Sequence, residues 1–366
     1  MKEMLYIRHA YHSKTKSNDF LIDILKKHYN ITIFDIDPYT EDLKTTLKNL
    51  PKKDFDVLVL FQLPIAGTIL KKYINFKKGI FFPMYDGAPQ RTDKIWLSWK
   101  SFNIINFSRT LHLELTKIGL SSFYVQYFPT PKLNVLNGEK NSAFFWQRLT
   151  HLNVNTIADI LKALSIKNIH IHKVVDPMHN FIKPTDETFN IEYSEWYENK
   201  NNMLKDVENA AIYIAPRDFE GIGMSFLEAM AMGRCVIAPN NPTMNEYITD
   251  GFNGILYELD NPKINKKYNI KSIQENTKKY IQQGYLKWSE EKNKILDYIN
   301  LPVQTNNKLL KQFKYQNYSF LQQIFSIKNE YSNKKIKIIT FLGIKVKIKS
   351  NIWILNIIQL KLQKIF

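Results

Sequence analysis

The sequence has one cysteine, Cys235, among its 366 residues, and it has no uninterrupted apolar run of the length of a membrane span. A single cysteine excludes an intramolecular disulfide framework and is typical of a reducing compartment. The opening residues, MKEMLYIRHAYHSK, lack the apolar segment of a secretory signal peptide, so we expect a cytoplasmic protein. A histidine ligand set is missing from the sequence, and no metal site is predicted.

Acidic residues are missing from the last part of the chain. No aspartate or glutamate follows Glu330, and the lysines found there supply nearly half of the formal net charge of +17: Lys334, Lys335, Lys337, Lys345, Lys347, Lys349, Lys361 and Lys364. Such a segment is attracted to anionic lipid, at about 1 kcal/mol per lysine near the surface. We therefore expect residues 301–366 to be a basic extension that binds the inner face of the plasma membrane. Packing on the body of the protein, or assembly of protomers, is the alternative.

The pattern within this extension supports a membrane surface more than a nucleic acid. Residues 335–349 alternate lysine with Ile or Val about Gly343, which predicts a hairpin, and residues 350–366 carry Trp353 and aliphatics suited to an interfacial amphipathic helix. Basicity alone would also permit binding of nucleic acid. The lysines are interleaved with aliphatic residues, however, and zinc spacing, a helix-turn-helix signature and an aromatic RNA-binding motif are missing. No nucleic-acid partner is predicted.

Hydrophobic residues are plentiful, at 44% of the chain, with 13% aromatic residues. A chain of this length exceeds the usual single core, so two domains are expected. Short apolar runs alternate with helical periodicity in both halves, which predicts two doubly wound parallel sheets. The expected strands are residues 4–7, 31–36, 57–61, 79–83, 104–107 and 123–128, then 143–148, 169–174, 189–193, 211–215 and 235–238, and the clearest helices are 19–28, 110–118, 155–164 and 278–299.

Breaks in composition suggest the boundaries of these domains. Pro129, Thr130 and Pro131 interrupt the chain, and a polar segment follows them. We expect an N-terminal domain at residues 1–131, a linker at 132–141, a C-terminal domain at 142–300 and the basic extension at 301–366. The helix at 278–299 is expected to complete the second domain or to cross back toward the first.

The most informative segment is PRDFEGIGMSFLEAMAMG, residues 216–233. It follows an expected buried strand, and Gly221 and Gly223 let the backbone approach a ligand before a helix begins. Amides at a helix N-terminus bind phosphate, and here they belong to Gly223, Met224 and Ser225. Glu220 is placed to face a sugar hydroxyl. The alternative is an ordinary strand-turn-helix unit whose glutamates cap or pair.

A second carboxylate, Glu228, lies inside this helix, which is otherwise almost wholly apolar and must be buried. A lone carboxylate there is costly to desolvate unless it is hydrogen-bonded. Glu228 therefore has either a protein partner or a hydroxyl-rich ligand such as a ribose, and we favour the ligand.

Glu220, seven intervening residues, Glu228 and the following GRCVIAPNNPTMNEYITDGFNGILYE resemble the nucleotide-sugar motif of family 4 type (group 1) retaining glycosyltransferases of GT-B fold. The resemblance implies two Rossmann-like domains facing across a cleft, with the nucleotide bound mainly by the second and the acceptor by the first. It implies a UDP-sugar as the commonest donor, no metal or other cofactor, and a glycan or lipid-linked acceptor in the synthesis of a cell-surface polysaccharide such as lipopolysaccharide or capsule.

The resemblance also implies roles for particular residues. In the family, an arginine after the first strand of the second domain and a lysine shortly beyond it neutralise the leaving diphosphate. Arg148 matches the arginine, whereas Asn153 stands in place of the lysine. Substitution of the lysine by His151 or Lys173, or action of Arg148 alone, stays open. A catalytically weakened protein that binds a sugar nucleotide, or a membrane-associated assembly protein, is therefore the alternative function.

In the first domain, the segment PMYDGAP stands where many relatives carry a His-Asp pair. Asp86 matches the aspartate and Tyr85 replaces the histidine, while a simple Asp-Gly turn is the alternative. The expected catalytic residues are thus Glu220, Arg148 and Asp86. The resemblance implies a front-face route in which the leaving phosphate helps to deprotonate the acceptor, although a covalent double displacement is not excluded by the sequence.

Overall fold

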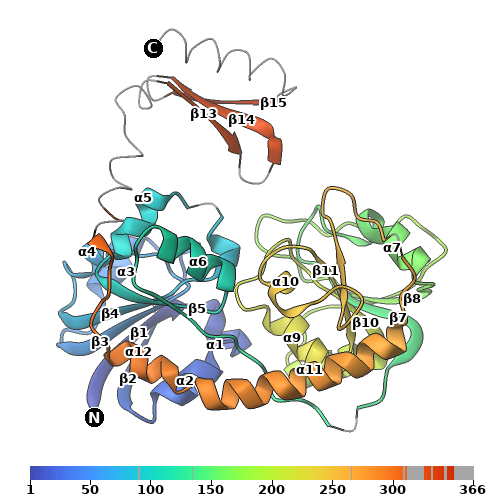
Figure 1. Ribbon diagram of the computed structural model, residues 1–366, viewed down its shortest axis with the longest axis horizontal. Coiled ribbons are helices and arrows are strands. Elements are labelled where there is room, and N and C mark those ends of the chain that lie inside the picture. The colour runs from blue at the N-terminus through green and yellow to red at the C-terminus, as the bar shows by residue number, and fades with distance from the viewer. Residues whose placement is uncertain are drawn as a thin grey trace.

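The computed structural model describes residues 1–307 except 90, 134 and 265, together with Leu310 and the backbone of three strands between residues 325 and 349. Within these residues, two α/β domains lie side by side, and each is built on a six-stranded parallel sheet (Figure 1). The fold class predicted from the sequence, two Rossmann-like domains of GT-B type, is confirmed.

The first domain contains a sheet with the strand order β2-β1-β3-β4-β5-β6. Its strands are β1 (Lys2–His9), β2 (Tyr29–Ile36), β3 (Phe55–Phe61), β4 (Phe76–Phe82), β5 (Phe102–Asn106) and β6 (Ser122–Tyr124). Its helices are α1 (Tyr11–Thr15), α2 (Asp19–Leu25), α3 (Leu43–Lys48), α4 (Gly67–Leu70), α5 (Asp93–Trp96) and α6 (Arg109–Lys117), with short 3-10 helices at Tyr85–Gly87 and Leu97–Trp99. All six expected strands are present.

The second domain repeats the plan with the order β12-β11-β10-β7-β8-β9. Its strands are β7 (Glu139–Trp146), β8 (Asn168–His172), β9 (Asn190–Ser194), β10 (Ala210–Ile214), β11 (Cys235–Pro239) and β12 (Ile255–Tyr257). Its helices are α7 (Ala158–Ala163), preceded by the 3-10 helix Val154–Ile157, α8 (Lys200–Asn209), α9 (Met224–Ala231), α10 (Met244–Tyr247) and α11 (Ile270–Glu291). The inner strands β10 and β11 are buried along their whole length, as continuous apolar runs in a covered parallel sheet should be.

Two of the boundaries that differ from the expectation have a clear physical reason. β7 begins at Glu139, inside the segment predicted as linker, because its first residues are polar and exposed and give no apolar signal. β6 ends at Tyr124, whereas the apolar run continues to residue 128. Tyr127 and Phe128 are apolar for another reason, since both are buried against helix α11: the Tyr127 ring lies 5.2 Å from that of Trp288.

Helix α11 connects the two domains. It runs along one side of both, and α12 (Lys294–Asn300) continues from it onto the first domain (Figure 1). There Asn103 of β5 donates its amide to the carbonyls of Tyr298 and Leu301. The single helix predicted at residues 278–299 is therefore two helices, and the chain does cross back toward the first domain.

The linker is held to the second domain by a buried arginine. Arg234, the residue before β11, has no exposed surface and donates to the carbonyls of Leu136, Glu208, Ala210 and Met232. A guanidinium satisfied by carbonyls in this way fixes where the chain enters the second sheet.

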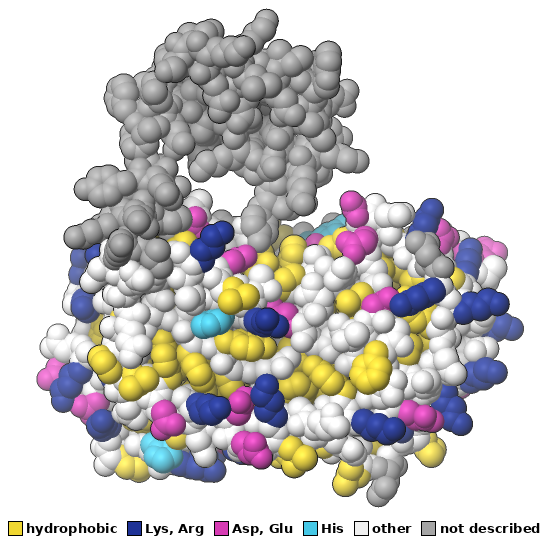
Figure 2. Space-filling model, in the orientation of Figure 1, with side chains coloured by type: hydrophobic (Ala, Val, Ile, Leu, Met, Phe, Trp, Pro, Cys, Tyr) yellow, Lys and Arg dark blue, Asp and Glu magenta, His cyan; other side chains and the backbone are white. Residues whose placement is uncertain are grey.

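In the basic extension, the structure describes the backbone of β13 (Phe325–Glu330), β14 (Asn333–Phe341) and β15 (Ile344–Lys349), which form a separate antiparallel sheet. β14 and β15 pair with Phe341 opposite Ile344, which confirms the predicted hairpin. The expected amphipathic helix at residues 350–366 lies outside the described residues. Among the helices that are described, none has the length and apolar character needed to cross a membrane. On the face shown in Figure 2, the described Lys and Arg side chains are interspersed with Asp and Glu.

Candidate active site

An arginine follows each of the two central strands of the second sheet, β7 and β10. From β7 the chain proceeds to β8 and β9 on one side, and β10 then returns to pair with β7 on the other side. The crevice at the carboxyl ends of β7 and β10 is therefore a topological switch point, the usual ligand site of a doubly wound sheet. Arg148 follows β7 and Arg217 follows β10.

A chain of ion pairs joins these arginines to both domains. Arg148 donates from Nε to Oδ1 of Asp176 at 2.8 Å, and Arg217 donates from Nη2 to Oδ2 of the same carboxylate at 2.5 Å. Arg217 also donates from Nη1 to Oδ2 of Asp86 at 3.1 Å. Because Asp86 follows β4 of the first domain, the carboxyl edges of the two sheets face each other at this cluster. The structure thus brings together two of the expected residues, Arg148 and Asp86, through Arg217.

Glu220 lies beside this cluster and is buried, with 8% of its surface exposed. Its Oε1 has no hydrogen-bond partner in the described part of the chain. Burial raises the pKa of Glu220 from the ordinary value of 4.5 to about 7, although the charges of Arg217 and Arg148 oppose the rise. A buried carboxyl with an unpaired oxygen is the kind of group that a ligand hydroxyl satisfies.

Glu228 occupies the middle of α9, whose other residues are mostly buried, as predicted. The structure gives it a protein partner, since Nζ of Lys200 lies 2.5 Å from Oε1 of Glu228. The carboxylate is 19% exposed and the ammonium 47% exposed. Of the two partners considered for Glu228, a protein group or a ligand, the structure shows the protein group, a half-exposed lysine at the start of α8.

Each glycine of the turn before α9 has a distinct structural role. Gly223 caps the helix with φ of +82°, a conformation that side chains rarely adopt, and an added Cβ would lie 1.9 Å from the ring of Phe226. At Gly221 an added Cβ would lie 2.8 Å from Met84 of the first domain. Gly221 thus permits close approach of the other domain, and the amides of Gly223, Met224 and Ser225 begin the helix as expected.

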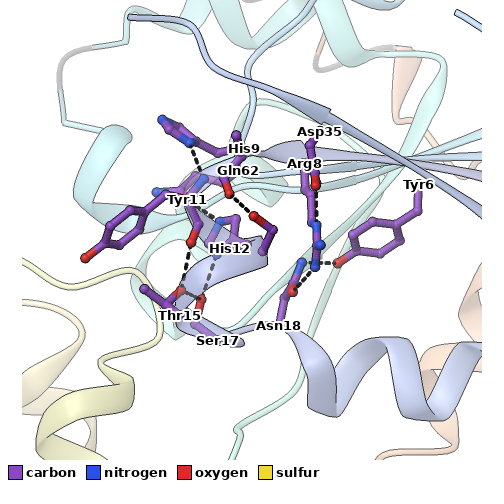
Figure 3. Close-up of polar contacts among 12 residues, drawn as sticks. Tyr6, Arg8, His9, Tyr11, His12, Thr15, Ser17, Asn18, Asp35 and Gln62 are labelled. Atoms are coloured by element: carbon purple, nitrogen blue, oxygen red, sulfur yellow. Dashed lines mark hydrogen bonds and ion pairs between the residues drawn. The ribbon is translucent and has the colours of Figure 1, made fainter. Parts of the chain in front are cut away.

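The three positions considered for the missing lysine are engaged elsewhere. Asn153 caps the 3-10 helix after β7 by accepting from the backbone amides of Asn155 and Thr156. His151 lies 2.7 Å from Asp218, and Lys173 lies 2.7 Å from Glu195. Figure 3 shows a second group of polar residues, in the loop after β1 of the first domain.

In that loop His12 fills the switch point of the first sheet, between the ends of β1 and β3. Its Nε2 lies 2.6 Å from Oε1 of Gln62, and its Nδ1 lies 2.6 Å from Oγ of Ser17 (Figure 3). Burial lowers the pKa of His12 to about 4, so the ring is neutral at neutral pH and donates to Gln62 while it accepts from Ser17. The neutral ring supplies no positive charge for a phosphate.

The far end of the same loop is fixed by Arg8. Its guanidinium pairs with Asp35 at 2.7 Å and donates to Oδ1 of Asn18 at 2.9 Å, and Asn18 in turn donates to the hydroxyl of Tyr6 (Figure 3). The loop is therefore held by hydrogen bonds at both ends, and it forms a defined border at the carboxyl edge of the first sheet.

Three residues of this site were not found from the sequence: Asp176, Arg217 and Lys200. One signal was present for Arg217, because it follows an expected central strand just as Arg148 does. Nothing in the sequence pairs Lys200 with Glu228 or places Asp176 between two arginines. In the described part of the chain, no three His, Cys, Asp or Glu side chains gather as a metal site.

Comparison with known proteins shows what the second domain is similar to. Residues 176–291, which include Asp176, Arg217, Glu220 and Glu228, match the family described as "Glycosyl transferases group 1". The matched residues lie in the second domain, which is therefore similar to a group 1 glycosyl transferase domain. An uncharacterized glycosyltransferase of Methanocaldococcus jannaschii is 27% identical over 149 residues, which are 38% of this chain and 41% of that protein. The chain thus matches less than half the length of that curated relative.

Solved structures resemble the two-domain body as well as the matched region. Sucrose-phosphate synthase from Thermosynechococcus elongatus gives a TM-score of 0.55 at 11% identity, over 81% of this chain and 100% of that one. The Anabaena protein HepE in complex with UDP gives a TM-score of 0.49 at 10% identity, over 86% of this chain and 99% of that one. The likeness to the synthase is one of fold, and it agrees with the GT-B arrangement of the two sheets.

The arrangement provides three chemical capabilities at one edge of the second sheet. Two guanidiniums supply positive charge and fork-shaped hydrogen-bond donors for an anion. Glu220 supplies a buried carboxyl group that can donate or accept a hydrogen bond. Glu228 supplies a partly exposed carboxylate in the middle of α9. These are the groups that a phosphate, a sugar hydroxyl and a ribose require.

Proposed function

We propose that the protein is a glycosyltransferase that moves a sugar, with retention, from a nucleoside-diphosphate donor to a glycan or lipid-linked acceptor. The observation that carries the proposal is the pair of guanidiniums, Arg148 and Arg217, at the switch point of the group 1 domain with Glu220 buried beside them. A UDP-sugar is the donor proposed first, because UDP is the commonest donor in the group that the motif resembles.

Each residue has a role that follows from its environment. Cleavage of a glycosyl-phosphate bond builds negative charge on the departing diphosphate, and Arg148 stabilises that charge with the amides at the start of α9. Glu220 holds sugar hydroxyls, and Glu228 binds the ribose after Lys200 turns away. Asp86 links the first domain to this site through its ion pair with Arg217. The leaving phosphate accepts the proton of the acceptor hydroxyl on the same face of the sugar, and the route uses no metal.

We further propose that the acceptor belongs to a cell-surface polysaccharide and that the enzyme works in the cytoplasm, at the inner face of the plasma membrane. The lysines after Glu330 support this placement through their attraction to anionic lipid. Deletion of residues 331–366 should abolish co-sedimentation with anionic liposomes while leaving nucleotide binding intact. Unchanged sedimentation of the shortened chain would refute the membrane role.

A catalytically weakened sugar-nucleotide-binding protein is the second candidate. It is favoured by one observation, that Asn153 caps a helix where the resembled family has a phosphate-binding lysine. Release of nucleoside diphosphate from a nucleotide sugar, with or without an acceptor, would exclude this candidate.

The experiment that tests nucleotide binding is calorimetric titration with UDP, GDP, ADP, CMP and dTDP. We expect one of them to bind well, and Glu228→Ala should weaken that binding by about tenfold or more through loss of a charge-assisted hydrogen bond. The exposed Glu187 provides the control, because Glu187→Ala removes an equal charge far from the motif. Absence of binding by every nucleotide would overturn the proposed function.

A further inference from the structure

The carboxylate of Asp176 is held by two guanidiniums at once. Arg148 contacts its Oδ1 at 2.7 Å and 2.8 Å, and Arg217 contacts its Oδ2 at 2.5 Å. The side chains involved are largely buried, with exposed fractions of 16% for Asp176, 15% for Arg148 and 23% for Arg217. Two arginines converging on one partly buried anion form an anion-binding site, which the protein fills with its own carboxylate.

Arg217 has one hydrogen-bond donor without a partner in the described residues. Its Nε is buried and has no partner in the described residues, although its two terminal nitrogens bond to Asp176 and Asp86. Glu220, whose charge interacts with that of Arg217, also carries a buried oxygen without a partner in the described residues. Buried polar groups are normally satisfied, so two such atoms on interacting residues point to a ligand at this cluster.

We propose that Arg217 is a second ligand of the donor diphosphate, and that Asp176 and Asp86 hold its guanidinium in place until the donor binds. This inference rests on the proposed function and deepens it, since it assigns the positive charge that Asn153, His151 and Lys173 do not supply. A guanidinium suits the task because its planar fork matches the oxygens of a phosphate.

The exchange of partners has a consequence for the contact between the domains. Asp86 lies in the first domain and Arg217 in the second, so the 3.1 Å ion pair between them is one of the links across the edge where the sheets meet. When Arg217 bonds to a phosphate oxygen, its ion pair with Asp86 is weakened. Asp86 therefore competes with the donor, and removal of its charge should favour diphosphate binding.

The inference predicts effects of opposite sign at two residues that bond to each other. We would titrate Arg217→Met, Asp86→Asn and the wild type with UDP, UMP and uridine, or with the matching set for another base if the nucleotide panel selects one. Arg217→Met should weaken diphosphate binding by about tenfold or more and leave nucleoside binding within about twofold, because a charge-assisted contact to phosphate is lost. Asp86→Asn should strengthen diphosphate binding by about threefold or more.

Two further variants complete the design. Lys162→Met removes an exposed cation paired with Asp186, far from the switch point, and should change no affinity. Arg217→Lys keeps the charge without the fork and should lie between wild type and Arg217→Met, and it replaces the methionine variant if that protein does not fold.

The outcomes separate the inference from the proposed function. If the wild type binds no nucleotide, the proposed function fails. If the wild type binds the diphosphate and the Arg217 variants bind it equally well, or if Asp86→Asn weakens binding as much as Arg217→Met does, only the inference is overturned. A purely structural role of Arg217 would lower nucleoside and diphosphate affinity alike, which would also overturn it.

Discussion

Replacement of Glu220 by glutamine should change how the stability of the protein depends on pH. Glu220 is buried beside the arginine cluster, and burial raises the pKa of its carboxyl group to about 7. Below the ordinary pKa of 4.5, the group is protonated in both the folded and the unfolded chain and contributes nothing. Between 4.5 and about 7 the unfolded chain has lost the proton and the folded chain keeps it, so the free energy of unfolding falls as the pH rises.

The size of the effect follows from the same two values. A pKa raised from 4.5 to about 7 corresponds to about 3 kcal/mol of unfolding free energy, at about 1.4 kcal/mol per pH unit. Most of this loss should be complete at pH 7 to 8. Glutamine has the shape of the protonated acid and does not ionise. Glu220→Gln should therefore show no such loss of unfolding free energy as the pH rises. The variant should therefore gain up to about 3 kcal/mol over the wild type between pH 4.5 and pH 8.

Urea unfolding of both proteins at half-unit steps from pH 4.5 to 8 measures this difference. Glu187→Gln, a change of the same chemistry at an exposed position, serves as the control and should follow the wild-type profile. Parallel profiles for wild type and Glu220→Gln would refute the reasoning, because they would mean that Glu220 ionises in the folded protein as it does in the unfolded chain.

Two further substitutions test how the domains are joined. Glu246 accepts hydrogen bonds from the hydroxyl of Ser108 and from the first amides of α6, so Glu246→Ala should lower the free energy of unfolding by about 2 kcal/mol and increase the radius of gyration in X-ray scattering. An unchanged radius would count against this link. At Gly284 of α11 an added Cβ would lie 2.2 Å from the ring of Phe128, so Gly284→Ala should cost about 1 to 3 kcal/mol in urea unfolding. The exposed neighbour Gln283→Ala should cost nothing, and equal effects of the two would show that the contact with Phe128 is unimportant.

Most strands of both sheets could be predicted because they are short apolar runs between polar breaks, but β12, which is three residues long, was not predicted. β4, β10 and β11 owe this pattern to coverage on both faces. The first turns of α11 could not be predicted in the same way, because polar residues contribute to their buried face. Gln274 is buried there by donating to the carbonyls of Asn137 and Ala211, and Thr277 by donating to those of Ile273 and Asn253. Hydrophobic periodicity does not detect a face that is buried through hydrogen bonds.

The site was predictable where a motif keeps its parts close in the sequence. Glu220 and Glu228 lie on one turn and its helix, so their spacing locates both. The pairing of Arg217 with Asp86 and Asp176 depends instead on the order of strands within a sheet and on the docking of two domains. Neither the strand order nor the docking of the domains can be read from the spacing of residues in the sequence. The role of Lys200 was hidden for the same reason, since α8 and α9 meet only in the folded domain.

The measurement that tests the central claim most directly is turnover of the donor. Wild type and Arg148→Met would be incubated with UDP-glucose and other nucleotide sugars, and release of the nucleoside diphosphate would be followed by coupled assay. We predict release from at least one donor by the wild type and a loss of about a hundredfold or more in the variant, since Arg148 stabilises the charge of the leaving diphosphate. Binding of a nucleotide without release from any sugar donor, with or without added glycan acceptors, would contradict the account and leave a binding protein in its place.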